Sequence, residues 1–222
     1  MQIPQNVKKI MDYILNILFP EFCFGCHAKD TVLCNDCLLK IKINDKTTEE
    51  NIVAIFDYRD ALIKNIIWQL KYHNQKSLGK KMGQILFEYS KDKLSEIVFL
   101  SSGKPLIIIP VPSSQKRLRN RGYNHAEILA RWFCNENPEN LELNNNIVFK
   151  KSETIHQAKI SNKKERLKNI KNSFDIRNNS NVRGRSIVLI DDVTTTGGTF
   201  FEIMKILKKA GAKKVFAIAL AH

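Results

Sequence analysis

The sequence predicts an α/β protein with a mostly parallel sheet flanked by helices, preceded by a small cysteine-rich module. From residue 51 onward, short β-branched apolar runs alternate with segments of helical periodicity, which is typical of a parallel sheet. Four of the five cysteines lie together near the N-terminus. The 222 residues suffice for one α/β domain and an appendage. We therefore expect an N-terminal helix and metal-binding module over 1–50 and an α/β domain over 51–222.

The first segment, residues 1–22, has the pattern of a short amphipathic helix ending at Phe19-Pro20. Lys8 and Lys9 precede an apolar run, as they would in a signal peptide. However, Asp12 interrupts the run, and no small-residue cleavage site follows. No stretch of the chain approaches the roughly 20 apolar residues of a membrane span. We therefore expect a cytoplasmic protein.

The cysteine cluster has the spacing Cys23-x2-Cys26-x7-Cys34-x2-Cys37. Two such pairs can give Zn²⁺ four thiolates in tetrahedral geometry, and a closed set of four leaves no open position for catalysis. A structural zinc site is therefore predicted, with a redox dithiol or an iron–sulfur cluster as the alternatives. We expect His27 to be a surface residue and Cys134 to be a small buried side chain.

The elements of the α/β domain follow from periodicity and from helix start and stop signals. We expect strands over 52–58, 106–111, 187–190 and 214–220, and helices over 61–72, 78–89, 124–135 and 199–210. Asn124 is the expected N-cap of the third helix, and Gly211 ends the last one. The polar, basic segments 113–122 and 150–173 are expected to be long loops or exposed helices.

The chain carries a net charge of +14, from 36 basic and 22 acidic residues. A surplus of this size favours a polyanionic partner such as nucleic acid, an anionic membrane surface or a phosphorylated ligand. The alternative is a solubilising surface in a composition rich in Lys, Asn and Ile.

A candidate binding motif follows the strand 187–190. Asp191 and Asp192 come first, and a threonine–glycine loop then leads into a helix. The loop consists of Thr194, Thr195, Thr196, Gly197, Gly198 and Thr199. Glycines let a backbone approach a phosphate closely, and N–H groups at a helix start bind it. The carboxylates suit ribose hydroxyls and Mg²⁺. The alternative role of the two acids is to cap the helix.

This motif, at 188–199, resembles the signature of the type I phosphoribosyltransferases: four apolar residues, two acids and a Thr/Gly phosphate loop. The resemblance implies a phosphoribosyltransferase-like fold and a ligand, phosphoribosyl pyrophosphate (PRPP), held with Mg²⁺. It implies that the acids hold the ribose hydroxyls and the loop holds the 5′-phosphate. The matching pyrophosphate loop is Val111, Pro112, Ser113 and Ser114, and the segment 152–174 is placed like a lid.

Further motifs narrow the resemblance to the ComF/ComFC family of competence proteins. They are Leu18-Phe19-Pro20, the two cysteine pairs, Leu70-Lys71-Tyr72, Pro110-Val111-Pro112, Arg117-x-Arg119-x-Arg121-Gly122-Tyr123-Asn124, Thr154-x2-Gln157 and Arg166-x2-Asn169. The chain departs from the family at His125, where Gln is usual, and at Lys150-Lys151, where Arg is expected. The resemblance implies a role in natural transformation, in which the protein handles incoming single-stranded DNA alongside a competence helicase.

The arginines Arg117, Arg119 and Arg121 alternate along the chain, and Tyr123 follows them. In an extended loop they would point to one side. They would then clasp pyrophosphate, or follow a nucleic-acid backbone with Tyr123 as a stacking platform. The alternative is a solvated basic surface.

Three functions remain open from the sequence. The first is a DNA-handling protein with a PRPP-type site. The second is an active phosphoribosyltransferase with an unknown acceptor, although few residues follow the signature to build a base-binding hood. The third is a PRPP-sensing regulator, for which no helix-turn-helix pattern is present.

Overall fold

The chain forms two structural units, Met1–Ile41 and Lys42–His222. A computed structural model describes residues 20–45, 51–73, 75–101, 103–151, 172–177 and 181–222. The expected N-terminal helix and most of the basic segment 150–173 lie outside these residues. The boundary falls before residue 50 because Lys42–Asp45 run beside the first strand of the second unit. There, the Asn44 N–H donates to the Ile55 carbonyl at 2.8 Å.

The described part of the first unit, residues 20–41, is a small segment that contains the short helix α2 (Asn35–Lys40). Phe22 and Lys29 form an isolated antiparallel bridge. Leu33 and Cys23 are fully buried. Within residues 20–41 the buried apolar side chains are few, and segments of this kind gain stability from a metal or a cross-link.

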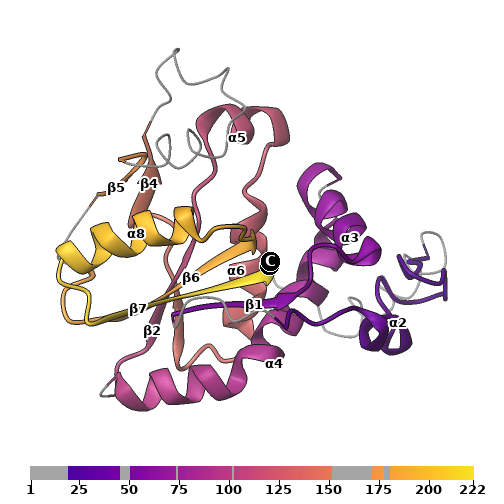
Figure 1. Cartoon of the computed structure of the whole chain (residues 1–222), viewed down its shortest axis with the longest axis horizontal. Helices are drawn as coiled ribbons and strands as arrows, with labels where there is room; N and C mark the ends of the chain where they lie inside the picture. The colour runs from indigo at the N-terminus through magenta and orange to yellow at the C-terminus, as the bar shows by residue number, and fades with distance from the viewer. Residues whose placement is uncertain (1–19, 46–50, 74, 102, 152–171, 178–180) are drawn as a thin grey trace, which may run out of the picture. The chain divides into compact units, whose positions relative to one another are not determined.

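The second unit is built on a five-stranded parallel sheet with the order β1-β7-β6-β2-β3 (Figure 1). The strands are β1 (Ile52–Phe56), β2 (Leu106–Pro110), β3 (Leu141–Leu143), β6 (Ser186–Val193) and β7 (Lys214–Ala221). Every residue of β2 is buried, as expected for a central strand with both faces covered.

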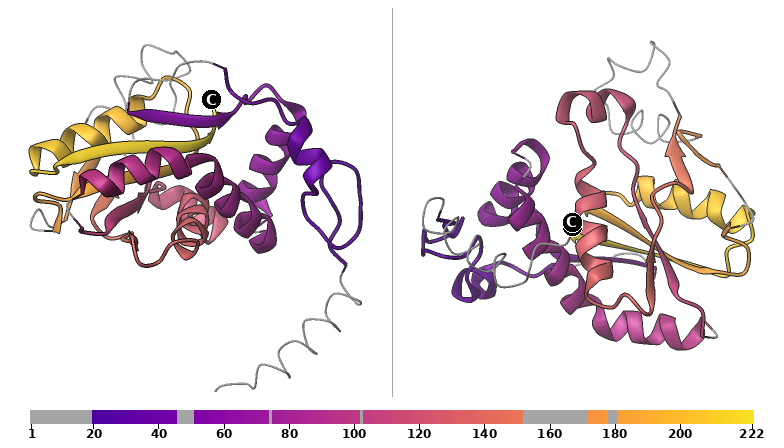
Figure 2. Two further views of the ribbon diagram at one scale, coloured as in Figure 1. Left: turned by 90° about the horizontal axis from the view of Figure 1, so that it is seen from below. Right: turned by 180° about the vertical axis from the view of Figure 1, so that it is seen from behind.

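Helices cover both faces of the sheet (Figures 1 and 2). One face is covered by α8 (Gly198–Lys209), and the other by α4 (Lys76–Leu100) and α6 (His125–Asn135). The described residues also form the helices α3 (Ala61–Tyr72) and α5 (Gln115–Arg121), and an antiparallel ribbon pairs β4 (Val148–Lys150) with β5 (Phe174–Ile176).

The core under α8 follows from helical periodicity. Phe200, Ile203 and Leu207 recur at the spacing that places side chains on one face, and they pack against Leu189 and Ala217 of the sheet. Burying each large apolar side chain contributes about 1.5–3 kcal/mol relative to leaving it exposed. This packing fixes the start of α8 against the end of β6.

Most of the predicted elements are confirmed, with two main differences in extent. The predicted helix 61–72 matches α3, but α4 extends well beyond residue 89. The strand predicted over 187–190 continues through Asp191 and Asp192. The segment 113–122 was expected to be a long loop or an exposed helix, and it forms the helix α5, which Ser114 caps and Gly122, at φ 76°, ends.

Candidate functional site

The acid pair, the threonine–glycine loop and the segment 111–114 lie at the carboxyl edge of the sheet, where β2 and β6 end side by side. Pro110 pairs with Ile190, and the Val111 N–H donates to the Ile190 carbonyl at 2.8 Å. The segments 111–114 and 194–199 therefore leave the sheet from neighbouring strands. Ligands of open parallel sheets bind at this edge.

Asp192 is the centre of a buried polar cluster. One carboxylate oxygen, Oδ2, lies 2.5 Å from the Lys71 Nζ, and the other, Oδ1, lies 3.3 Å from the His125 Nε2. Lys71 comes from the last turn of α3 and His125 from the first residue of α6. Each oxygen of the buried acid thus has its own partner from a different helix.

The neighbours of His125 determine which ring nitrogen carries its proton. The Arg121 Nη1 lies 3.5 Å from the His125 Nδ1. A guanidinium can only donate, so Nδ1 accepts and the proton of the neutral ring lies on Nε2. From Nε2 it is donated to Asp192. His125 therefore contacts Arg121 through Nδ1 and Asp192 through Nε2.

The two acids differ in their proton affinity. Burial and the neighbouring charge of Asp192 raise the pKa of Asp191. Burial also opposes the charge of Asp192, but the hydrogen bond from His125 and the charge and hydrogen bond of Lys71 outweigh it and lower the pKa of Asp192. One ligand atom each from His125, Asp191 and Asp192 lies within 4.8 Å of the other two. The surroundings therefore favour the charged form of Asp192 more than that of Asp191.

The threonine–glycine loop turns sharply into α8. Gly197 adopts φ 70° and is the N-cap, where it supplies no side-chain hydrogen bond. A Cβ at this position would lie 2.7 Å from the Phe201 Cε2. Thr195 and Thr196 are exposed, Thr194 and Gly197 are buried, and Gly198 and Thr199 are half-buried. A helix start without a side-chain cap presents N–H groups that can bind an anion.

The segment 111–114 is fixed by hydrogen bonds to Asn124. The Asn124 Nδ2 donates to the Val111 carbonyl at 3.0 Å, and the Ser113 hydroxyl donates to the Asn124 Oδ1 at 3.0 Å. Ser114 is buried and accepts from the Arg117 N–H at 3.4 Å. Pro112 is half-buried between them. The segment is therefore held in a single conformation beside the acid pair.

The prediction that three arginines share one side of an extended loop is wrong. They lie on α5, and at about 100° per residue Arg117 and Arg121 share one face while Arg119 points elsewhere. The Arg121 guanidinium lies 4.7 Å from the centre of the Tyr72 ring. The half-buried Tyr123 donates its hydroxyl to the Leu70 carbonyl at 2.7 Å. Its ring is thereby fixed against α3.

The four N-terminal thiols form a compact group that could hold a metal ion. The Cys34 Sγ lies 3.7 Å from that of Cys23 and 3.6 Å from that of Cys26, and all four thiols, Cys37 included, lie within 4.8 Å of one another. A tetrahedral ion with bonds of about 2.3 Å requires sulfurs about 3.8 Å apart.

The environment of Cys23 also favours a ligand. Burial alone would raise the pKa of its thiol, but N–H groups, among them those of Cys34 and Gly25 at 3.4 Å, lower that pKa to about 6. Within the described residues, His27 is exposed and outside this group. Cys134 is buried in α6, where burial raises its pKa to about 12. Both outcomes agree with the sequence prediction.

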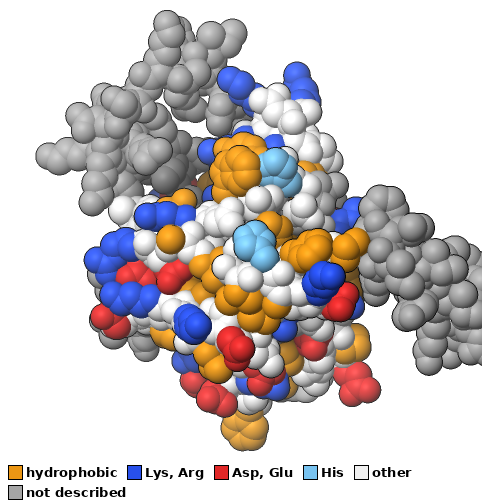
Figure 3. All heavy atoms as spheres, turned by 90° about the vertical axis from the view of Figure 1, so that its right-hand side faces the viewer, with side chains coloured by type: hydrophobic (Ala, Val, Ile, Leu, Met, Phe, Trp, Pro, Cys, Tyr) orange, Lys and Arg blue, Asp and Glu red, His pale blue; other side chains and the backbone are white. Residues whose placement is uncertain are grey.

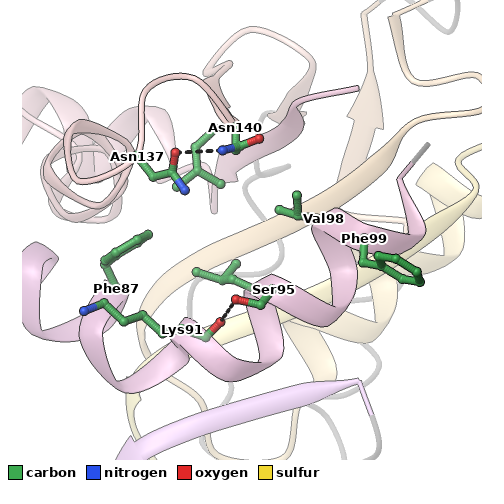
Figure 4. A pocket seen from close by; sticks show the side chains of 9 residues that line it. Phe87, Lys91, Ser95, Val98, Phe99, Asn137 and Asn140 are labelled. Atoms are coloured by element: carbon green, nitrogen blue, oxygen red, sulfur yellow. Dashed lines mark hydrogen bonds between the residues drawn. The ribbon is translucent and has the colours of Figure 1, made fainter. Parts of the chain in front are cut away.

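A separate pocket of 360 Å³ lies along the second half of α4 (Figure 4). Its lining includes Phe87, Val98 and Phe99, together with Asn137 and Asn140 from the turn after α6. None of its lining residues belongs to the groups described above.

Residues 81–222 match the family described as the phosphoribosyl transferase domain. The chain is 34% identical to Competence protein F of Haemophilus influenzae over 94% of this chain and 93% of that protein. It is 28% identical to Competence protein ComFC of Bacillus subtilis, covering 97% and 80% of the two chains. It is 29% identical to DNA utilization protein YhgH of Escherichia coli K12, covering 82% and 74%.

The chain belongs to the ComF/ComFC family. The match confirms the type I phosphoribosyltransferase-like fold expected from the sequence. In the part of the ComF-family chain that the structure describes, no helix has the length and apolar character needed to cross a membrane.

Lys71 and His125 were not identified as site residues from the sequence. Lys71 stands in the motif Leu70-Lys71-Tyr72, and His125 directly follows the motif that ends at Asn124. Nothing in the spacing indicates that the end of α3 approaches β6. For His125 the sequence offered one signal, its place at a position where Gln is expected, since both side chains can donate a hydrogen bond to a carboxylate.

Proposed function

We propose that this protein binds a PRPP-type ligand with Mg²⁺ and handles single-stranded DNA during DNA uptake. The observation that carries the proposal is that three pieces converge at the ends of β2 and β6. These pieces are the acid pair, the start of α8 and the segment 111–114. At this edge of the sheet, the acid pair would bind the sugar, and the start of α8 and the segment 111–114 would each bind a phosphate group.

In this proposal Asp191 and Asp192 accept hydrogen bonds from the ribose hydroxyls and ligate Mg²⁺. The N–H groups at the start of α8 bind the 5′-phosphate, helped by the threonine hydroxyls. The N–H groups of Ser113 and Ser114 bind the pyrophosphate, since Pro112 has none to offer. The ion would supply positive charge to the pyrophosphate oxygens.

We assign a structural zinc ion to the first unit. The observed sulfur separations of 3.6 and 3.7 Å fit a tetrahedral zinc site. A closed set of four thiolates supplies stability without chemistry, which suits a segment with few buried apolar side chains.

The DNA-handling role rests on charge and on the relatives. The net charge is +14, and α5 carries four basic and no acidic residues. The relatives are named for competence and DNA utilization. We place the protein in the cytoplasm, where incoming single strands and a competence helicase are its expected partners.

The test is calorimetric titration of PRPP with Mg²⁺ into the protein and into the double variant Asp191→Asn, Asp192→Asn. We expect the variant to lose at least about 100-fold in affinity while its circular dichroism stays unchanged. Asp175→Asn is the matched control, because this exposed acid forms an ion pair with Lys151 and does not belong to the acid pair. Retained affinity in the double variant would refute the ribose assignment.

Transfer of phosphoribose to an unknown acceptor is the second candidate function. The observation that favours it is the acid pair and phosphate loop standing together in a phosphoribosyl transferase domain. PRPP-dependent release of pyrophosphate, screened over candidate acceptors, distinguishes an active transferase from a binding protein. An acceptor-dependent turnover abolished by the double variant would establish the transferase.

A further inference from the structure

The outer face of α3 carries large aromatic side chains that the core does not use. Trp68 is 49% exposed and Tyr72 is 58% exposed, and the exposed His73 follows the helix. We call these three residues the aromatic stripe. Figure 3 shows hydrophobic side chains beside histidine at the surface on the side of the molecule where α3 lies.

The three rings are arranged as a continuous surface. The Trp68 ring centre lies 4.4 Å from that of His73 and 5.9 Å from that of Tyr72. The Arg121 guanidinium lies over Tyr72 at 4.7 Å and joins α5 to the stripe. The rings therefore hold one another in place without being buried.

The stripe is not needed to anchor α3. The buried face of this helix consists of Ile63, Ile66, Ile67 and Leu70. Removal of Trp68 or Tyr72 would therefore leave the packing of α3 largely intact. Adjacent exposed aromatic side chains that the packing of α3 does not require indicate an interaction surface.

The positive charge around the aromatic stripe indicates an anionic partner. Residues 61–73 contain no Asp or Glu, and Lys64 lies one helical turn before Trp68 on the same exposed face. Arg117 and Arg121 share one face of α5. A ligand that matches this surface would have flat rings that stack on the aromatic side chains and an anionic backbone that contacts the arginines. Unpaired nucleic-acid bases meet this description, whereas paired bases are shielded inside a duplex.

We propose that the aromatic stripe is a stacking surface for single-stranded DNA, on which bases stack against Trp68 and Tyr72 while Arg117 and Arg121 contact the phosphates. This inference rests on the proposed function, since it names the surface that performs the DNA-handling part of it. It also replaces Tyr123, whose hydroxyl is bound to the Leu70 carbonyl, as the stacking residue.

The first measurement uses Trp68 as the reporter. The chain has two tryptophans, so Trp132→Phe leaves Trp68 as the sole tryptophan, whose emission can be excited selectively over that of the tyrosines. Stacking of a base on the indole should quench this emission when oligo(dT) is added. Unchanged emission at oligo(dT) concentrations that saturate the protein would overturn the proposal.

The second measurement is fluorescence anisotropy of labelled oligo(dT) over a range of salt concentrations. We expect Trp68→Ala and Tyr72→Ala each to weaken binding roughly 5- to 100-fold with the salt dependence unchanged. Trp68→Phe should recover most of the affinity, because the ring is retained. Arg117→Ala should instead lower the slope of log K against log salt by roughly 0.7. Phe99→Ala, an 86% exposed aromatic on the last turn of α4, is the control and should bind like the unmodified chain.

The outcomes separate this inference from the proposed function. If the unmodified chain binds oligo(dT) and both alanine variants bind equally well, the DNA surface lies elsewhere and only the stripe assignment fails. If the unmodified chain does not bind oligo(dT), the DNA-handling role itself fails. A loss of self-association in Trp68→Ala by analytical ultracentrifugation, with DNA affinity unchanged, would identify a second copy of the chain as the occupant.

Discussion

Replacing His125 tests whether Asp192 must be held by a donor. We compare His125→Leu, which removes the donor, with His125→Gln, which restores an N–H donor from an amide. In the structure the Asp192 Oδ1 lies 3.3 Å from the His125 Nε2, and both side chains are buried. Water therefore cannot readily replace the lost hydrogen bond in the leucine variant.

The loss of stability in His125→Leu follows from the hydrogen-bond partners that the Asp192 carboxylate keeps. After His125→Leu, Lys71 still holds Oδ2, but the facing Oδ1 is left without its donor. An unsatisfied buried acceptor costs about 1–3 kcal/mol. For a chain of this length each 1 kcal/mol lowers the thermal midpoint by about 2–4 °C. We therefore expect a decrease of roughly 2–12 °C for His125→Leu and a much smaller one for His125→Gln.

The affinity for PRPP and Mg²⁺ should also decrease more in His125→Leu than in His125→Gln. Removing a group that orients a metal-binding carboxylate typically costs about 10- to 100-fold in affinity. Calorimetric titration with PRPP and Mg²⁺ should show this loss for His125→Leu and near-normal affinity for His125→Gln. In ¹⁵N NMR, the His125 ring should carry its proton on Nε2. Equal behaviour of the two variants, or a proton on Nδ1, would refute the positioning role.

Three further expectations address other parts of the molecule. Cys23→Ser should lose bound zinc in metal analysis, whereas Cys134→Ser should keep it, and full zinc content in the first variant would refute the four-thiolate site. Gly197→Ala should lower stability by about 1–3 kcal/mol in urea unfolding. Gly184→Ala should cost less, because it shares the positive φ but meets no atom within 4 Å. The hydrogen bonds from Arg59 lower the pKa of Asp57, so its stabilisation is complete above its ordinary pKa near 4 and lost as pH falls further. The stability difference between the unmodified chain and Asp57→Asn should therefore be constant from pH 5 to 7 and shrink below about pH 4.

Local signals in the sequence were enough to predict most of the sheet. The run Leu106–Ile109 is apolar throughout because a central parallel strand is buried on both faces, and β7 has the same character. The cap at Asn124 was also correct, since its side chain accepts from the Ala126 N–H. In each case a few neighbouring residues carry the whole signal.

The errors arose where the signal depends on distant residues. β3, β4 and β5 have three residues each, too few to show a period. For α5 the sequence left a loop and an exposed helix both open, because Leu118 is the one apolar residue among its seven and no apolar stripe distinguishes the two. The pairing of Lys71 with Asp192 joins positions far apart in the chain, and it depends on the angle at which α3 meets the sheet. Periodicity contains no information about that angle.

The segment Leu70-Lys71-Tyr72 joins the two proposed sites through three consecutive residues. Lys71 is the counter-ion of Asp192, Leu70 accepts the hydrogen bond from Tyr123, and Tyr72 lies in the aromatic stripe. A Mg²⁺ ion at Asp192 would compete with the Lys71 ammonium, since both are cations at the same carboxylate. Displacement of Lys71 would act on the same helix end that presents Tyr72. Thermodynamic linkage then requires that PRPP and single-stranded DNA alter each other's affinity by the same factor, and Lys71→Met should reduce that factor toward unity.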